Sequence, residues 1–230
     1  MKTIGLIGGM SWESSIEYYR IINELVRERL GGVHSAKCVM VSVDFAEIEP
    51  LQHQGKWEET GEMLIKSAIS LENSGADFIV LCTNTMHKVA EDIQAHTQIP
   101  LLHIADATGQ RVINSGIRKV ALLGTRFTME EDFYKGRLLQ KFNLDVLIPN
   151  SGEREIIHNV IYKELVVGKI QQKSKEQYLQ IIRRMVGEGA EGIILGCTEI
   201  GLLVKQTDCP VPVFDTTTIH AEAAVTFALD

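Results

Sequence analysis

The chain has 230 residues, of which 45% are hydrophobic, and a formal net charge of −7. This composition can bury an ordinary core in one large domain or two small ones. No basic run is present, so nucleic acid is not expected as a partner, because phosphate binding needs clustered lysine or arginine. No stretch approaches the about 20 apolar residues of a membrane span, so we expect a cytoplasmic protein with no membrane partner.

Four cysteines and seven histidines are spread along the sequence. The cysteines form no Cys-x-x-Cys pair, and no two histidines have the spacing of metal ligands on one helix face. We therefore expect reduced thiols in a reducing compartment, no disulfide and no metal site.

Short apolar runs alternate with amphipathic segments in chain order. Apolar or β-rich runs predict strands near 3–7, 38–43, 78–82, 101–104, 119–123, 144–148, 192–195 and 211–214. Helical spacing predicts helices after an N-cap at Ser11, over 57–73, from 84 or 85, and over 106–116, 128–141, 154–167, 175–187, 198–204 and 217–229. A loop is expected through Pro50, Gln52 and Gly55.

The sequence contains an internal repeat at half its length. Residues 75–85 read GADFIVLCTNT and residues 189–199 read GAEGIILGCTE, and a second match relates 4–8 to 120–124. Near-continuous apolar strands separated by helices are typical of parallel α/β proteins with both sheet faces covered. Two open sheets facing each other fit the repeat most simply, although one barrel made of two half-barrels stays open.

The predicted fold is a pair of pseudo-symmetric, doubly wound α/β/α domains with parallel sheets and the active site at their interface. Residues 1–98 plus 211–230 are expected to form the first domain. Residues 99–210 are expected to form the second.

The repeat also fixes which residues are equivalent. Gly75 aligns with Gly189 without a gap, so Cys82 falls opposite Gly196 and Thr83 falls opposite Cys197. Matching the two Cys-Thr dipeptides instead would slip the alignment by one residue and exchange the two faces of the strand. We predict that Thr83 faces Cys197 across a cleft and that Cys82 is structural.

Function is expected at the carboxyl ends of the strands, where short polar turns precede helices. Free backbone N–H groups at helix starts bind anions, most simply a carboxylate. Cys197 directly precedes a predicted helix, whose field lowers the pKa of a thiol from about 8.5. We therefore expect Cys197 to provide a thiolate that can take a proton. No phosphate loop or dinucleotide fingerprint is present.

Two turns carry a resemblance to a known family. Thr83-Asn84-Thr85 and Gly196-Cys197-Thr198-Glu199 resemble the paired Cys-Asn-Thr and Gly-Cys-Thr-Glu motifs of the aspartate/glutamate racemases, which work without pyridoxal phosphate. Three further segments look like that family, so the resemblance covers the whole chain: Gly8-Gly9-Met10-Ser11-Trp12, Asp106-Ala107-Thr108 and Phe214-Asp215-Thr216-Thr217. It implies an amino-acid substrate between two α/β domains, no cofactor, a homodimer and a two-base reaction at Cα.

The sequence departs from that pattern at one position. Thr83 stands where the family carries its first catalytic cysteine, and a hydroxyl is a poor base that can still return a proton. Retention of Cys197 with loss of its partner resembles the racemases specific for L-aspartate and L-glutamate. The resemblance therefore implies interconversion of L- and D-glutamate or aspartate with a kinetic preference for the L substrate.

The remaining roles follow from the same resemblance. It implies that Thr83, Asn84, Thr85 and Thr198 hold the α-carboxylate and that Glu199 binds the α-ammonium group or orients Cys197. Met10 and Gln52 lie in segments that line the family's site, and Gln52 replaces an arginine that the aspartate-restricted members look as if they carry. Lys163 is a candidate partner of the side-chain carboxylate, or equally a solvated residue of its helix.

Two alternatives remain open at this stage. A maleate isomerase or arylmalonate decarboxylase would also use a cysteine in the cleft, and a decarboxylase needs one proton donor and no second base. A dicarboxylate-binding protein that lost turnover with the replacement at Thr83 is the non-enzymatic alternative.

Overall fold

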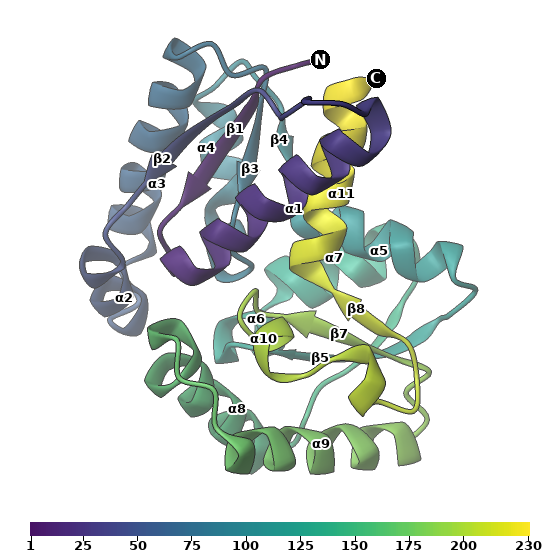
Figure 1. The fold of residues 1–230 in the computed structure, drawn as a ribbon. Coiled ribbons are helices and arrows are strands. Elements are labelled where there is room, and N and C mark those ends of the chain that lie inside the picture. The colour runs from purple at the N-terminus through teal and green to yellow at the C-terminus, as the bar shows by residue number, and fades with distance from the viewer. The chain divides into compact units, whose positions relative to one another are not determined.

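A computed structural model describes residues 1–230 and contains two separate parallel sheets of four strands each (Figure 1). The first sheet has the order β2-β1-β3-β4 and the second the order β6-β5-β7-β8. The strands are β1 (Ile4–Gly8), β2 (Cys38–Ser42), β3 (Phe78–Leu81), β4 (Leu101–Leu102), β5 (Lys119–Gly124), β6 (Asp145–Leu147), β7 (Gly192–Gly196) and β8 (Val213–Asp215). The predicted parallel α/β class is confirmed, and the single barrel is excluded.

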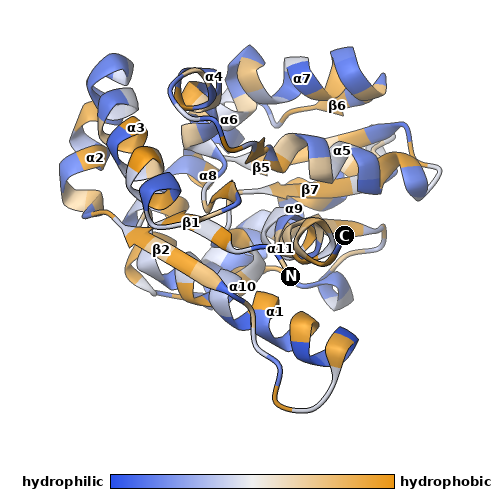
Figure 2. Ribbon diagram, turned by 90° about the horizontal axis from the view of Figure 1, so that it is seen from above, coloured by the Kyte–Doolittle hydropathy of each residue, from blue (hydrophilic) through white to orange (hydrophobic).

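The first sheet is covered on both faces (Figure 1). Its helical elements are α1 (Trp12–Leu30), α2 (Phe45–His53), α3 (Trp57–Asn73), η1 (Thr85–Val89), α4 (Ala90–Ala95) and most of α11 (Thr216–Leu229). Ile4 and Leu6 pack with α1 and α11 on one face, whereas Ile7 packs with α2, α3 and η1 on the other. This alternation follows the period of two in a strand. Figure 2 shows β2 mostly in the orange of hydrophobic residues.

The second sheet is covered in the same way. Its helical elements are α5 (Ile104–Asn114), α6 (Arg126–Glu130), α7 (Asp132–Phe142), α8 (Ser151–Lys163), η2 (Leu165–Val167), α9 (Gln172–Gly187), α10 (Ile200–Leu203) and η3 (Gln206–Asp208). Ile193 and Leu195 pack with α8 and α9, whereas Ile194 packs with α5 and α7. No helix is both long and apolar enough to cross a membrane.

The chain divides into two compact units, Met1–His103 with His220–Asp230, and Ile104–Ile219. The expected boundaries lay at 98/99 and 210/211. They differ because β8 pairs with β7, with Ile193 opposite Val213, and therefore belongs to the second sheet. The helix after each sheet's last strand also packs in the other unit: α5 follows β4 but joins the second core, and α11 follows β8 but contributes Ala221 to the first.

Strand pairing confirms the register of the repeat within each unit. Ile4 pairs with Phe78 in the first sheet, and the equivalent residues Val120 and Gly192 pair in the second. The Gly-Ala-acid segment that begins each copy of the repeat makes the same hydrogen bonds in both units. Its acidic side chain accepts backbone N–H bonds at the start of the central strand, from Thr3 to Asp77 at 2.6 Å and from Lys119 to Glu191 at 3.1 Å. Gly75 and Gly189 precede it with positive φ angles of 83° and 97°, which glycine adopts without strain.

Four local predictions differ from the structure. Phe45–His53 is a helix rather than a loop, because Asp44 caps it by accepting from the Ala46 N–H at 3.0 Å and because Ile48 is buried against the sheet. Helical spacing predicted that Ile16, Tyr19, Ile22 and Val26 form the apolar face of α1. Ile22 and Val26 are buried, but Ile16 and Tyr19 are exposed, and Tyr18 is buried instead. The predicted helix over 128–141 is divided into α6 and α7, and the one over 198–204 shortens to α10.

Candidate active site

The first polar turn follows β3, a central strand of the first sheet. Thr83 is buried and is held through its backbone: its N–H donates to the Leu81 carbonyl at 2.8 Å, and its carbonyl lies 2.7 Å from Nδ1 of His87. Asn84 and Thr85 are buried beside it, and η1 begins at Thr85. The three residues therefore lie at the carboxyl end of the strand, where the sequence placed them.

Cys82 packs in the core of the first unit. Its side chain is fully buried in the cluster that contains Tyr18 and Ala221, and its N–H donates to the Ile7 carbonyl at 2.9 Å. Burial raises the pKa of the Cys82 thiol well above its ordinary value. This place in the core supports the structural role that was predicted for Cys82.

Cys82→Ser should leave catalysis within about threefold of wild type, because a core thiol that contacts no substrate can lose stability without changing the chemistry. The measurement is kcat for the amino-acid racemisation that the family resemblance implies, normalised to the folded fraction seen by circular dichroism. Cys82→Ala is the matched variant that adds no hydroxyl. A folded variant with less than about a hundredth of the activity would mean that the sulfur takes part in the reaction.

The second polar turn follows β7 and holds a buried thiol beside a buried carboxylate. Cys197 Sγ donates to Glu199 Oε2 at 2.9 Å, and Thr198 Oγ1 donates to the same oxygen at 2.9 Å. Cys197 is 8% exposed and Glu199 is 2% exposed. Gly196 allows this turn to approach its neighbours closely, since a Cβ there would come within 2.6 Å of Leu122 Cδ1.

The expected thiolate at Cys197 is not what the structure provides. Burial and the charge of Glu199, which also accepts a hydrogen bond from the thiol, raise the pKa of Cys197 well above its ordinary value. The backbone N–H groups of Thr198 and Glu199 oppose this rise without reversing it. The predicted lowering of the pKa by a helix was wrong, because α10 is a single turn of four residues and the carboxylate lies closer. Cys197 is therefore a thiol in contact with a proton acceptor.

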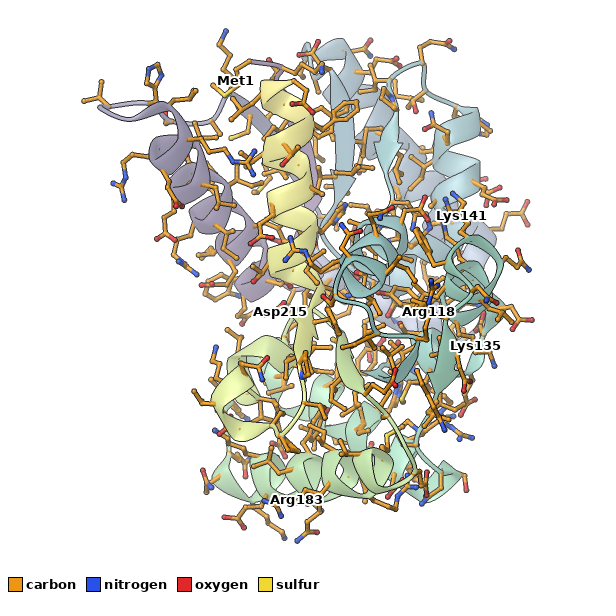
Figure 3. The ribbon with its side chains drawn as sticks, turned by 90° about the vertical axis from the view of Figure 1, so that its right-hand side faces the viewer. Met1, Arg118, Lys135, Lys141, Arg183 and Asp215 are labelled. Carbon is orange, nitrogen blue, oxygen red and sulfur yellow. The ribbon has the colours of Figure 1, made fainter.

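The segment from Phe214 to Thr217 braces the Cys197 turn. Thr216 Oγ1 donates to the Leu195 carbonyl at 2.7 Å, and Thr217 Oγ1 donates to the Thr198 carbonyl at 3.4 Å. Asp215, labelled in Figure 3 where β8 leads into α11, accepts the Thr217 N–H at 2.9 Å. This motif near the end of the chain therefore fixes the backbone on both sides of Cys197.

Asp106 belongs to another of the segments that carried the family resemblance, and it joins two helices. Its carboxylate accepts from Arg137 on α7 at 2.5 Å and from Lys141, labelled in Figure 3, at 2.8 Å. Partial burial opposes ionisation, but these two hydrogen bonds outweigh it and lower the pKa of Asp106. Asp106 thus holds α5 against α7.

Three further candidates lie outside the two polar turns. Met10 is buried in the same apolar cluster of the first unit as Met86, and Gln52 on α2 donates from Nε2 to Met86 Sδ at 3.0 Å. Lys163 is the last residue of α8, in the second unit, and its side chain is exposed. No three His, Cys, Asp or Glu side chains gather in a way that could hold a metal ion.

His87 is the residue of the first turn that sequence reasoning missed. Its ring touches the Thr83 backbone from four positions further along the chain. The spacing of four residues is the only signal in the sequence that points to His87. It predicts a contact with Thr83 only if a helical turn follows β3.

The chain is a two-unit α/β protein, with a buried thiol–carboxylate pair on one copy of a repeated parallel sheet and a threonine at the equivalent position of the other copy. The chain matches the model of the family described as Asp/Glu/hydantoin racemase over residues 7–224. It belongs to that family.

Relatives with solved structures share the whole fold. A protein from Yersinia pestis, provisionally designated an Asp/Glu racemase, is 54% identical with a TM-score of 0.92, and each chain covers 100% of the other. An aspartate racemase homologue from Pyrococcus horikoshii OT3 is 38% identical with a TM-score of 0.85, again over 100% of both chains. The broad specificity amino-acid racemase RacX of Bacillus subtilis (strain 168) is 24% identical over 234 residues, covering 96% of each chain.

Proposed function

We propose that the protein interconverts L- and D-aspartate or glutamate by proton transfer at Cα, without pyridoxal phosphate, and that Cys197 and Thr83 act on opposite faces of that carbon. The observation that carries the proposal is the 2.9 Å contact between the buried Cys197 thiol and the buried Glu199 carboxylate. Membership of the racemase family and the designation of the Pyrococcus relative as an aspartate racemase homologue support it.

The proposed reaction starts from the thiol form of Cys197. Its S–H proton passes to Glu199, which leaves a thiolate beside a neutral carboxyl group. The thiolate takes the α-proton of the L amino acid and becomes a thiol again, while the substrate becomes a carbanion. The Thr83 hydroxyl gives a proton to the other face and takes one from water in the same step, and Glu199 then releases its proton to solvent.

The two directions use unequal groups. From the D side, the Thr83 hydroxyl has to act as the base, for which it is far less suited than a thiol. The equilibrium constant between enantiomers is one, so kcat/KM is equal in the two directions. The preference for the L substrate therefore shows in kcat and KM separately, with faster turnover of saturating L substrate.

The other candidates would bind the substrate. The Thr83 hydroxyl and the polar groups of Asn84, Thr85 and Thr198 suit an α-carboxylate, because turns at the start of a helix can bind anions. Met10, Gln52 and Lys163 are proposed to contact the side chain, with the exposed Lys163 ammonium as the partner of a side-chain carboxylate. We further propose that the protein acts as a homodimer.

Glu199→Gln should lower the racemisation rate by about a hundredfold to a thousandfold, because the amide has the same shape but cannot accept the Cys197 proton as a base. Loss of the neighbouring negative charge should at the same time lower the pKa of Cys197. Thiolate absorbance during a pH titration measures the pKa, and chiral chromatography measures the rate.

The control for that variant is Glu164→Gln, which neutralises a part-buried glutamate of the same unit that accepts from Ser174 at 2.6 Å. This control should keep wild-type turnover. If Glu199→Gln retained more than about a third of the wild-type rate, Glu199 could not be the proton acceptor.

The function is tested by incubating the protein with L-aspartate and with L-glutamate and separating the enantiomers on a chiral column. Formation of the D form that stops at equal amounts supports the proposal. Conversion of maleate to fumarate, or carbon dioxide release from an arylmalonate, with no D amino acid formed, would favour a rival enzyme instead. Saturable binding of a dicarboxylate without turnover would favour the binding protein.

A further inference from the structure

Three buried histidines gather in the first unit beside the Thr83 turn. His87 is 3% exposed, and its ring centroid lies 4.5 Å from that of His103 and 5.9 Å from that of His220. His103 and His220 are also the residues at which the chain leaves and re-enters this unit. We call these three residues the histidine cluster.

Hydrogen bonds fix the tautomer of His220. A backbone carbonyl can only accept, so Nε2, which lies 2.8 Å from the Leu102 carbonyl, carries the proton. Burial lowers the pKa of His220 to about 4, so the ring is neutral and its Nδ1 accepts from the Tyr18 hydroxyl at 2.9 Å. This ring therefore joins α1, α11 and β4 in one fixed arrangement.

The same rule fixes one nitrogen of His87. Its Nδ1 lies 2.7 Å from the Thr83 carbonyl and must be the donor. That carbonyl belongs to the peptide between Thr83 and Asn84, so the bond sets the orientation of the peptide plane. The Thr83 N–H is bound to Leu81, and thus both sides of this residue are held.

We propose that His87 is a positioning residue, which holds Thr83 in the orientation needed to return the proton to Cα, with the histidine cluster fixing the His87 ring. The inference rests on the proposed racemase function. Small misplacements of a reacting group are costly, because proton transfer needs near-ideal geometry. The step that should suffer on loss of His87 is the return of the proton by Thr83, and not its removal by Cys197.

The test compares two variants of the full-length protein. His87→Leu removes the donor and should lower kcat/KM for L-aspartate by about tenfold to a hundredfold. His87→Asn can offer an amide N–H near the place of Nδ1 and should restore kcat/KM to within about threefold of wild type. His96→Leu is the control. His96 makes the same kind of contact, from Nδ1 to the Asp92 carbonyl at 2.8 Å, but it is exposed and lies at the end of α4 rather than at the Thr83 turn.

Isotope effects give a readout that a structural role would not move. When proton return becomes slower, proton removal by Cys197 comes to equilibrium. The ratio of kcat/KM for α-protonated to α-deuterated L-aspartate should therefore shrink toward one in His87→Leu. The solvent isotope effect should rise at the same time. Both effects are ratios and do not depend on the folded fraction.

Unchanged isotope effects in His87→Leu, or equal losses in the Leu and Asn variants, would overturn the role of His87. If His87→Leu does not fold, His87→Gln replaces it, since its amide reaches past the place of Nδ1 and should show the same isotope pattern. A wild-type protein without racemisation would overturn the proposed function as well, whereas an active wild type with unaffected His87 variants overturns this inference alone.

Discussion

Cys197→Ser should lower the racemisation of L-aspartate by about a thousandfold or more while the protein stays folded. An alcohol is far weaker as an acid than a thiol, so Glu199 cannot generate the base that removes the α-proton. The serine hydroxyl can still donate a hydrogen bond to Glu199, as the Cys197 thiol does at 2.9 Å. Chiral chromatography of the product under saturating substrate measures the effect.

The matched control is Cys209→Ser, which replaces a half-buried free cysteine at the edge of the same apolar cluster as Cys197. It should keep wild-type turnover. A Cys197→Ser variant with more than about a tenth of the wild-type rate would show that another group removes the proton.

Thr83→Cys should raise kcat for D-aspartate by about tenfold or more. A thiol at this position is a much better base than a hydroxyl, and in the proposed reaction the D enantiomer presents its α-proton to the group at position 83. Because the two directions share one value of kcat/KM, that value should rise for both enantiomers. Initial rates with each pure enantiomer measure the change.

The control for this gain is Thr97→Cys. Thr97 is a buried threonine of the same unit, but its hydroxyl donates to the Ile93 carbonyl at the end of α4. This variant should turn over D-aspartate at the wild-type rate. If Thr83→Cys left kcat for D-aspartate unchanged, position 83 would not act on the substrate.

The sequence predicted most of the fold because its signals are local and repeated. The Gly-Ala-acid start recurs at a fixed offset, so one ungapped alignment gave the register that the pairs Ile4–Phe78 and Val120–Gly192 confirm. Because adjacent residues of a strand point to opposite faces, the same register also predicted that Cys82 packs in the core and Thr83 does not. Patterns of this kind depend on residues only a few positions apart.

Features that depend on tertiary packing could not be read in this way. The pKa of Cys197 is set by how deeply the turn is buried and by where the Glu199 carboxylate points, and neither is encoded in the Cys-Thr-Glu spacing. The exchange of α5 and α11 between units depends on which sheet each helix packs against. The ring contacts of His87 with His103 and His220 join residues that are not neighbours in the sequence.

Helix α2 shows a different limit. Pro50 and Gly55 are strong signals for a loop, and the prediction followed them. In the structure, the Asp44 side chain caps a helix at this place. The burial of Ile48 and Gln52 favours the helix in the folded protein. Tertiary packing therefore overrode local propensity at this segment.

The most direct test of the two-sided reaction is to incubate L-aspartate with the protein in heavy water and to follow Cα by NMR during the first turnovers. In the proposed reaction, Cys197 removes the original proton from one face, and Thr83 supplies a solvent-derived deuteron to the other. The account predicts that newly formed D-aspartate carries deuterium at Cα while the remaining L-aspartate still carries its proton. D-aspartate that retained the original proton would contradict it, because a single group would then have moved that proton from one face to the other.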